Sequence, residues 1–163
     1  MCANAPSPAS SAIDSVGIVA KTSLKEAVPI VQNVVAWLKE RNLRPIIEEN
    51  TASLANLSVL ETADSATLPT TADLILVLGG DGTLLGVARQ IATVANGPPI
   101  LAVNFGGLGF LTEITLSELF ETLTTVIDGK AGIDERRMLR ARTVREDNVL
   151  AERLALNLSL IHI

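Results

Sequence analysis

The stretch Asp73-Leu-Ile-Leu-Val-Leu-Gly-Gly-Asp-Gly-Thr-Leu-Leu85 leads from a run of apolar residues directly into a Gly-Gly-Asp-Gly-Thr turn, and a helical pattern follows at once. A short, bounded apolar run is typical of a strand that is buried on both faces of a parallel sheet. Open α/β sheets bind ligands at the carboxyl ends of their strands, so the turn predicts a phosphate site that contains the carboxylate of Asp81. We expect Gly79, Gly80 and Gly82 to adopt positive φ angles and to let the backbone approach a ligand closely.

Strands and helices alternate along the chain on both sides of this stretch. The apolar patterns predict strands over 16–20, 44–48, 74–78 and 100–103, and helices over 25–41, 83–95 and 116–127. Such alternation implies an α/β fold with a doubly wound parallel sheet. Residues 51–71 are rich in Ala, Ser and Thr, and their periodicity is too weak to predict an element.

The composition divides the chain of 163 residues into three parts. Residues 1–14, rich in Ala, Ser and Pro, are expected to form a disordered tail. Residues 15–132 are expected to form an α/β nucleotide-binding domain. Residues 133–163 contain two strand-like segments, 138–144 and 149–157, joined by a polar turn. Because a lone two-stranded ribbon is marginal in water, we expect these residues to be the first hairpin of an incomplete β-rich domain.

Charge and composition exclude several classes of function. A formal net charge of -5 argues against a nucleic-acid surface, which needs basic residues to neutralise phosphates. The uncharged stretch 91–112 is broken repeatedly by Gly and Pro, so we expect a soluble core segment and no membrane association. Cys2 is the only cysteine and His162 the only histidine, which leaves no disulfide framework, Cys-rich metal site or His-based triad. A reducing, cytoplasmic location fits this composition.

The glycine turn does not match the two common nucleotide fingerprints. The chain has no Gly-x-x-x-x-Gly-Lys-Ser/Thr segment, and the spacing of Gly80, Gly82 and Gly86 is one residue too long for the usual dinucleotide motif. A tight turn in which Asp81 only caps the next helix is the structural alternative. Two glycines before Asp81 and one after it favour the ligand site.

A second glycine turn, Asn104-Phe-Gly-Gly-Leu-Gly-Phe-Leu-Thr112, follows the next strand. Two adjacent strands that each end in such a turn would form two walls of one cleft. Asn104 could hydrogen-bond to a ribose or a base, and Phe110 could lie against a flat ring. The alternatives, that Asn104 is only a turn residue and Phe110 only a core residue, carry about equal weight at this point.

Three segments together resemble NAD kinases, in the family's order and at family-like spacing, over roughly residues 16–157. They are Gly-Gly-Asp-Gly-Thr-Leu-Leu at 79–85, the second glycine turn at 104–112, and Ala-Leu-Asn at 155–157. The first motif is shared with diacylglycerol kinases, sphingosine kinases and, loosely, phosphofructokinases. The second is far more particular to NAD kinases.

The resemblance implies that ATP phosphorylates the 2′-hydroxyl of the adenosine ribose of NAD, with Asp81 as the base. Polyphosphate is an alternative donor. The implied cofactor is Mg²⁺ carried with ATP, with no metal ligand from the protein. The residues that the resemblance assigns to nucleotide binding are Gly79, Gly80, Asp81, Gly82, Thr83, Asn104, Gly106, Gly107, Gly109, Phe110 and Asn157.

One position departs from the family pattern. Asn157 matches the first member of an Asn-Glu or Asn-Asp pair that holds the ribose, but Leu158 stands in the second place and cannot accept those hydrogen bonds. The family's β-rich domain extends well beyond this length, so the resemblance implies an amino-terminal part of an enzyme that is inactive alone and forms homo-oligomers, dimers or tetramers, when complete. The rival interpretations are a lipid kinase of the diacylglycerol or sphingosine type and a truncated nucleotide-binding domain without catalysis.

Overall fold

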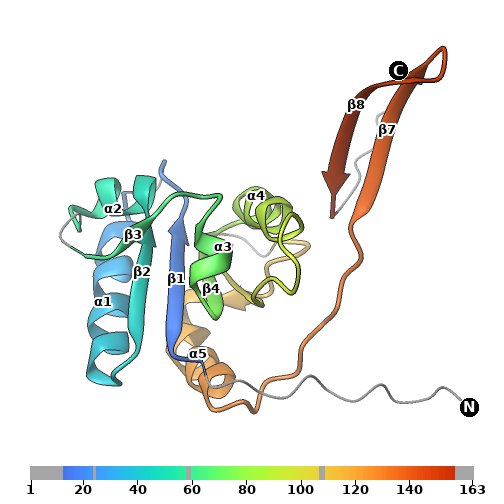
Figure 1. The fold of residues 1–163 in the computed structure, drawn as a ribbon. Helices are drawn as coiled ribbons and strands as arrows, with labels where there is room; N and C mark the ends of the chain where they lie inside the picture. Colours follow the sequence, from blue (N-terminus) through green and yellow to red (C-terminus); the bar gives the residue numbers. More distant parts are fainter. Residues whose placement is uncertain (1–12, 24, 58–59, 107–108, 157–163) are drawn as a thin grey trace, which may run out of the picture.

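The computed structural model describes residues 13–23, 25–57, 60–106 and 109–156, most of them in an α/β body (Figure 1). The strands of its sheet are β1 (Ser15–Ala20), β2 (Arg44–Glu48), β3 (Thr62–Ala63), β4 (Leu74–Gly79), β5 (Ile100–Asn104) and β6 (Ile114–Thr115). The helices are α1 (Ala27–Glu40), α2 (Glu49–Ala55), α3 (Leu68–Thr71), α4 (Asp81–Ile91), the 3-10 turn η1 (Leu116–Glu118) and α5 (Leu119–Ile127). Two further strands, β7 (Leu139–Arg145) and β8 (Asn148–Ala155), form a hairpin.

All six strands of the body run parallel, in the order β3-β2-β1-β4-β5-β6. The order changes direction between β1 and β4: the chain proceeds outward from β1 through β2 to β3, and outward again from β4 through β5 to β6. Ligands of open α/β sheets bind in the crevice at such a switch point, beyond the carboxyl ends of the strands. The predicted doubly wound parallel sheet is therefore confirmed, with its switch point beside the Asp81 turn.

Both faces of the sheet are covered by helices. Alternate residues of β4 point to opposite faces, and all six residues of this strand are buried. Leu74, Leu76 and Leu78 join the apolar cluster that packs on α1, α2 and α5, whereas Ile75 and Val77 join the cluster on the side of α3 and α4. This double coverage explains why β4 reads as an uninterrupted apolar run rather than as an alternating pattern.

The region of weak periodicity, 51–71, contains three short elements that the sequence did not predict: most of α2, then β3 and α3. The side chain of Glu48, the last residue of β2, caps α2 by accepting the backbone N–H of Thr51 at 2.9 Å. Glutamate is not a favoured cap, and elements of two to seven residues are too short to show a period.

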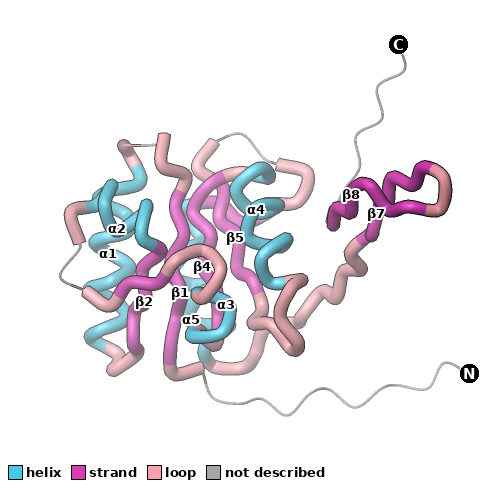
Figure 2. Tube along the Cα trace, turned by 45° about the horizontal axis from the view of Figure 1, so that its top comes forward, coloured by secondary structure: helices cyan, strands magenta, loops and turns pink. Residues whose placement is uncertain are grey.

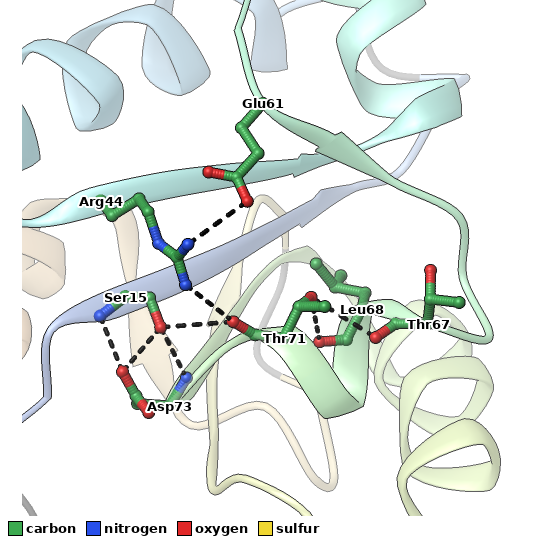
Figure 3. Close-up of polar contacts among 7 residues, drawn as sticks. All are labelled: Ser15, Arg44, Glu61, Thr67, Leu68, Thr71 and Asp73. Carbon is green, nitrogen blue, oxygen red and sulfur yellow. Dashed lines mark hydrogen bonds and ion pairs between the residues drawn. The ribbon is translucent and has the colours of Figure 1, made fainter.

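Polar contacts link the amino-terminal ends of the strands, at the edge of the sheet opposite the Asp81 turn (Figure 3). Oδ2 of Asp73 accepts the backbone N–H of Ser15 at 2.8 Å and its hydroxyl at 2.6 Å, which joins the starts of β4 and β1. Arg44, at the start of β2, donates to the carbonyl of Thr71 at 3.3 Å. Burial raises the pKa of Asp73, but the hydrogen bonds from Ser15 and Asp14 and the charge of Arg44 together hold it below its usual value.

The hairpin β7–β8 projects beyond the α/β body, and most of its side chains are exposed (Figure 2). Both of its strands were predicted. The expected boundaries of the three parts of the chain stay predictions, and residues 1–12 of the expected tail lie outside the described residues. Within the described ranges, no helix has the length and apolar character needed to cross a membrane.

Candidate functional site

Three strand ends meet at the carboxyl edge of the sheet. The last residue of β4, Gly79, lies in register with Asn104, the last residue of β5. On the other side of β4, the backbone N–H of Lys21, directly after β1, donates to the carbonyl of Leu78 at 2.9 Å. Phe105 extends the pairing by donating its N–H to the carbonyl of Gly79 at 3.3 Å. Residues from three segments distant in sequence are therefore brought together around the first glycine turn.

Asp81 is the first residue of α4, two residues before the predicted start of this helix, and its N-cap is Gly80. Asp81 is thus not the cap residue, and its carboxylate binds another turn, so the alternative in which Asp81 only caps the helix is wrong. The carboxylate instead accepts hydrogen bonds from the second glycine turn. Oδ2 accepts the N–H of Phe110 at 2.9 Å, and Oδ1 accepts the N–H of Leu111 at 3.1 Å. Oδ1 also accepts the N–H of Thr112 at 3.1 Å and its hydroxyl at 3.0 Å.

These contacts keep Asp81 ionised. Burial raises its pKa, but the N–H groups of Leu111 and Phe110 and the two donors of Thr112 outweigh burial and hold the pKa below its usual value. A carboxylate at the first turn of α4 is further favoured by the positive end of the helix dipole. The two glycine turns thus form one unit, with the charge of Asp81 at its centre.

The glycines of this unit are required for the space around them and not for an unusual backbone conformation. Positive φ is wrong for Gly79, Gly80 and Gly82; among the described glycines only Gly129, in a turn after α5, has a positive φ. A Cβ at Gly79 would approach Oγ1 of Thr83 to 2.6 Å, so a side chain there would force Thr83, in the first turn of α4, to shift. Cβ atoms at Gly80 and Gly82 would meet nothing within 4 Å. These two glycines leave open space where a ligand can reach the backbone.

Asn104 and Phe110 differ from each other in burial. Asn104 is buried, and its Oδ1 accepts the N–H of Gly106 at 2.9 Å, which gives it the turn role considered from the sequence. Phe110 is 81% exposed although its N–H is bonded to Asp81, so the alternative of a core phenylalanine is wrong. The structure therefore presents an exposed aromatic side chain on the residue whose backbone N–H binds the carboxylate, and an exposed ring can contact a planar ligand.

Two hollows adjoin the first glycine turn. The smaller, of about 190 Å³, is lined by Lys21, Gly79, Gly80, Asn104, Phe105 and Gly106. The larger, of about 360 Å³, lies between the ends of β1 and β2 and the first turns of α4, and its lining includes Lys21, Thr22, Glu48, Gly82, Thr83 and Gly86. Lys21 borders both, and its ammonium makes no hydrogen bond or ion pair with another described residue. Lys21 was not predicted as a site residue, because its only signal in the sequence is its place directly after a strand.

Some of the expected site residues lie outside the described part of the chain. Gly107, Asn157 and Leu158 lie outside the described residues, as does His162. No group of three or more His, Cys, Asp or Glu side chains suited to a metal ion occurs in the parts of the chain that the structure describes. Arg140 and Arg142 of the hairpin both pair with Glu152, at 3.2 and 2.7 Å, on an exposed surface.

Comparisons with known proteins point to one family. The family model described as the ATP-NAD kinase N-terminal domain matches residues 16–131. The NAD kinase of Syntrophotalea carbinolica is 43% identical over 126 residues, which are 77% of this chain and 43% of that protein. The NAD kinase of Geotalea daltonii is 41% identical over 142 residues, 87% of this chain and 49% of that protein. The chain thus spans about half the length of the curated relatives that it matches.

A solved structure shares the fold. The crystal structure of yeast NADH kinase complexed with NADH superimposes with a TM-score of 0.74 at 21% identity, over 90% of this chain and 47% of that one. At this identity the likeness concerns the fold alone. The match of the family model over most of the chain and the identities to the two bacterial relatives show that the chain belongs to the NAD kinase family.

Proposed function

We propose that this chain supplies the catalytic aspartate and one wall of the substrate cleft of an enzyme that phosphorylates NAD to NADP with ATP. The observation that carries the proposal is the position of Asp81: its ionised carboxylate lies at the carboxyl edge of the sheet and is held by the second glycine turn, in which the side chain of Phe110 is exposed. A fixed anion held by a turn that also carries an exposed aromatic side chain suits a nucleoside hydroxyl as the acceptor better than an acyl chain.

In the proposed reaction Asp81 accepts the proton of the adenosine ribose 2′-hydroxyl as the oxygen of that hydroxyl attacks the terminal phosphorus of ATP. A new oxygen–phosphorus bond forms, the bond to the leaving oxygen of ADP breaks, and the proton passes to the carboxylate. Phosphoryl transfer depends mainly on positioning and on stabilisation of negative charge, and it requires little covalent work from the protein. A positioned base contributes roughly 10²- to 10⁴-fold to such a step.

The larger hollow is the proposed place of the donor. It is lined by Gly82 and Thr83 at the start of α4, and Lys21 lines both this hollow and the smaller one beside Asn104. A cation that borders both hollows can attract the phosphate that is transferred from the donor to the acceptor. The same residues would bind ATP or polyphosphate, because both donors present phosphate groups to them.

The chemistry of the described residues does not fit a protein cage for magnesium, because no cluster of three acidic or imidazole ligands is present among them. Mg²⁺ is usually held by one or two carboxylates together with substrate phosphates. We therefore assign no reaction step to the metal and propose that it arrives with ATP. We further propose that the complete enzyme is cytoplasmic and assembles into homo-oligomers.

A second candidate function is nucleotide binding without turnover. The four hydrogen bonds on the Asp81 carboxylate favour it, because an acid with a lowered pKa is a weak base. The two candidates make different predictions for Asp81→Asn. Loss of NADP formation with retained NAD binding supports catalysis, whereas a protein that binds NAD but forms no NADP before any substitution supports the binding module.

The experiment measures NADP formation and NAD binding by two proteins. One is the 163-residue chain, and the other is a chimera that continues residue 156 with the carboxyl-terminal half of the Syntrophotalea carbinolica relative. Both receive ATP or polyphosphate with magnesium, and a diacylglycerol acceptor is offered in parallel. NADP formation by the chimera that depends on Asp81 is the expected result. Phosphorylation of the lipid in place of NAD contradicts the proposal.

A further inference from the structure

Thr112 is one of the few polar residues that are completely buried, with 0% of its surface exposed. It lies in the second glycine turn, 31 positions after Asp81 in the sequence, and both its backbone N–H and its hydroxyl donate to Oδ1 of that carboxylate. An ionised carboxylate has no proton to give, so the hydroxyl of Thr112 is the donor in the 3.0 Å contact. The direction of this hydrogen bond is thereby fixed.

The two oxygens of Asp81 are used unequally. Oδ1 accepts three hydrogen bonds, from the N–H of Leu111 and from both donors of Thr112. Oδ2 accepts one, from the N–H of Phe110. A carboxylate oxygen offers about two lone-pair sites, so Oδ1 is saturated while Oδ2 retains room for one more donor. The oxygen that can accept the hydroxyl proton of a substrate is therefore Oδ2.

Space at the turn restricts Asp81 in the same way. A Cβ at Gly109 would collide with Oδ1 of Asp81 and with Oγ1 of Thr112, so the glycine is needed for these two side chains to meet. Oδ1 is enclosed on this side, whereas the ring of Phe110, whose N–H binds Oδ2, is exposed. The packing around Gly109 therefore encloses Oδ1, the oxygen that Thr112 binds, whereas Oδ2 binds the N–H of a residue whose side chain is exposed.

We propose that Thr112 is a positioning residue: its hydroxyl anchors Oδ1 of Asp81 so that Oδ2 is presented to the acceptor hydroxyl. This inference rests on the proposed function, in which Asp81 is the base. Thr112 itself touches no reacting atom. Its effect on catalysis passes through the orientation and the proton affinity of Asp81.

Two pairs of variants isolate the hydroxyl of Thr112. Threonine and Thr112→Val differ chiefly in a hydroxyl against a methyl group, and Thr112→Ser and Thr112→Ala differ only in the hydroxyl. The second pair keeps the test open if the Val variant fails to fold. Thr124→Val is the matched control, because Thr124 donates its hydroxyl to the carbonyl of Phe120 on the exposed side of α5.

The first measurement needs no turnover. The side-chain carboxyl carbon of Asp81 is followed by NMR against pH in the 163-residue chain. Removing a donor from a charged carboxylate weakens the ionised form, so the midpoint of the titration should rise in the Val and Ala variants. It should stay close to the parent value in Thr112→Ser and in Thr124→Val. Equal midpoints for the Ser and Ala variants overturn the proposal.

The second measurement uses the chimera. We expect the Val and Ala variants to lower kcat about tenfold, with the KM for NAD within about twofold of the parent, and to move the acid limb of the kcat profile to higher pH. Thr112→Ser should restore the parent behaviour. If the Thr112 variants keep the parent kcat while Asp81→Asn inactivates the protein, the positioning role of Thr112 is overturned and the role of Asp81 as the base stands. If Asp81→Asn retains activity, the proposed base and the positioning role fail together.

Discussion

The place that a side chain would need at Gly109 is filled by the carboxylate of Asp81. These residues belong to different glycine turns, one after β4 and the other after β5, so the contact holds the two turns together at the sheet edge. Four hydrogen bonds to Asp81 from Phe110, Leu111 and Thr112 complete the contact. The turns therefore behave as one structural unit, and substitutions on either side of it should have related effects.

Gly109→Ala should destabilise the fold, because its Cβ would displace the Asp81 carboxylate from its donors. A cost of about 1–3 kcal/mol is expected for inserting a group into a packed site. Gly80→Ala is the matched control, since a Cβ there meets nothing within 4 Å and the φ of -119° suits any residue. Urea denaturation measures both. Equal stabilities of the two variants would contradict the packing argument.

Asp81→Asn should lower kcat of the chimera by roughly 10²- to 10⁴-fold if the carboxylate is the base. The amide has nearly the same shape but takes up a proton far less readily. Asp128→Asn serves as the control, because Asp128 pairs with Lys130 on the surface after α5. NADP formation is the readout. A fall of similar size in both variants would attribute the effect to charge in general.

Phe110→Ala should leave the stability of the fold within about 0.5 kcal/mol of the parent, because the ring is 81% exposed. Its expected effect is on substrate binding, with the KM for NAD raised about tenfold through the loss of a stacking contact. Ile133→Ala removes another exposed apolar side chain and should leave the KM unchanged. Steady-state kinetics of the chimera and thermal melting of the chain distinguish the outcomes.

Lys21→Ala should raise the KM for ATP more than the KM for NAD, because Lys21 borders the larger hollow proposed for the donor. Lys21→Arg keeps the charge and should recover part of the loss. Lys39→Ala, in the last turn of α1, is the control. An unchanged KM for ATP in Lys21→Ala would place the donor elsewhere.

The stability of the chain should fall in acid, and Asp73 should account for part of this. Its pKa is lowered in the folded state, so its stabilising contribution is complete above the unfolded-state pKa of about 3.9 and is lost as the pH falls through the folded value. Asp73→Asn should be less stable than the parent at pH 6, with the difference shrinking towards pH 3. Urea midpoints over this range measure it. A constant difference between the two proteins would exclude ionisation of Asp73 as the cause.

The long, regular elements could be predicted from the sequence, and the short ones could not. The apolar run of β4 and the helical period of α1 are strong local signals, and both elements lie where the patterns place them. The two turns of α2 depend on the side chain of Glu48, and β3 exists through its pairing with β2. Neither cause is visible in a local period.

The candidate site was likewise predicted only in part from the sequence. Sequence motifs singled out Asp81 and the second glycine turn, but the expectation of positive φ angles at Gly79, Gly80 and Gly82 was wrong. A local motif indicates that a position does not tolerate a side chain, but it does not show the physical reason. The neighbours of each glycine give the reason: Thr83 occupies the space beside Gly79, whereas open space lies above Gly80.

The sequence by itself determined the alternation of strands and helices, the burial of β4 on both faces and the two glycine turns, because periods and turn residues act over a few positions of the chain. Only the tertiary structure decided that β1 lies beside β4, that Lys21 therefore borders the glycine turn, and that Asp81 binds donors 29 to 31 positions away. Strand order and long-range hydrogen bonds depend on how the elements pack in space, and no local pattern of residues specifies that packing.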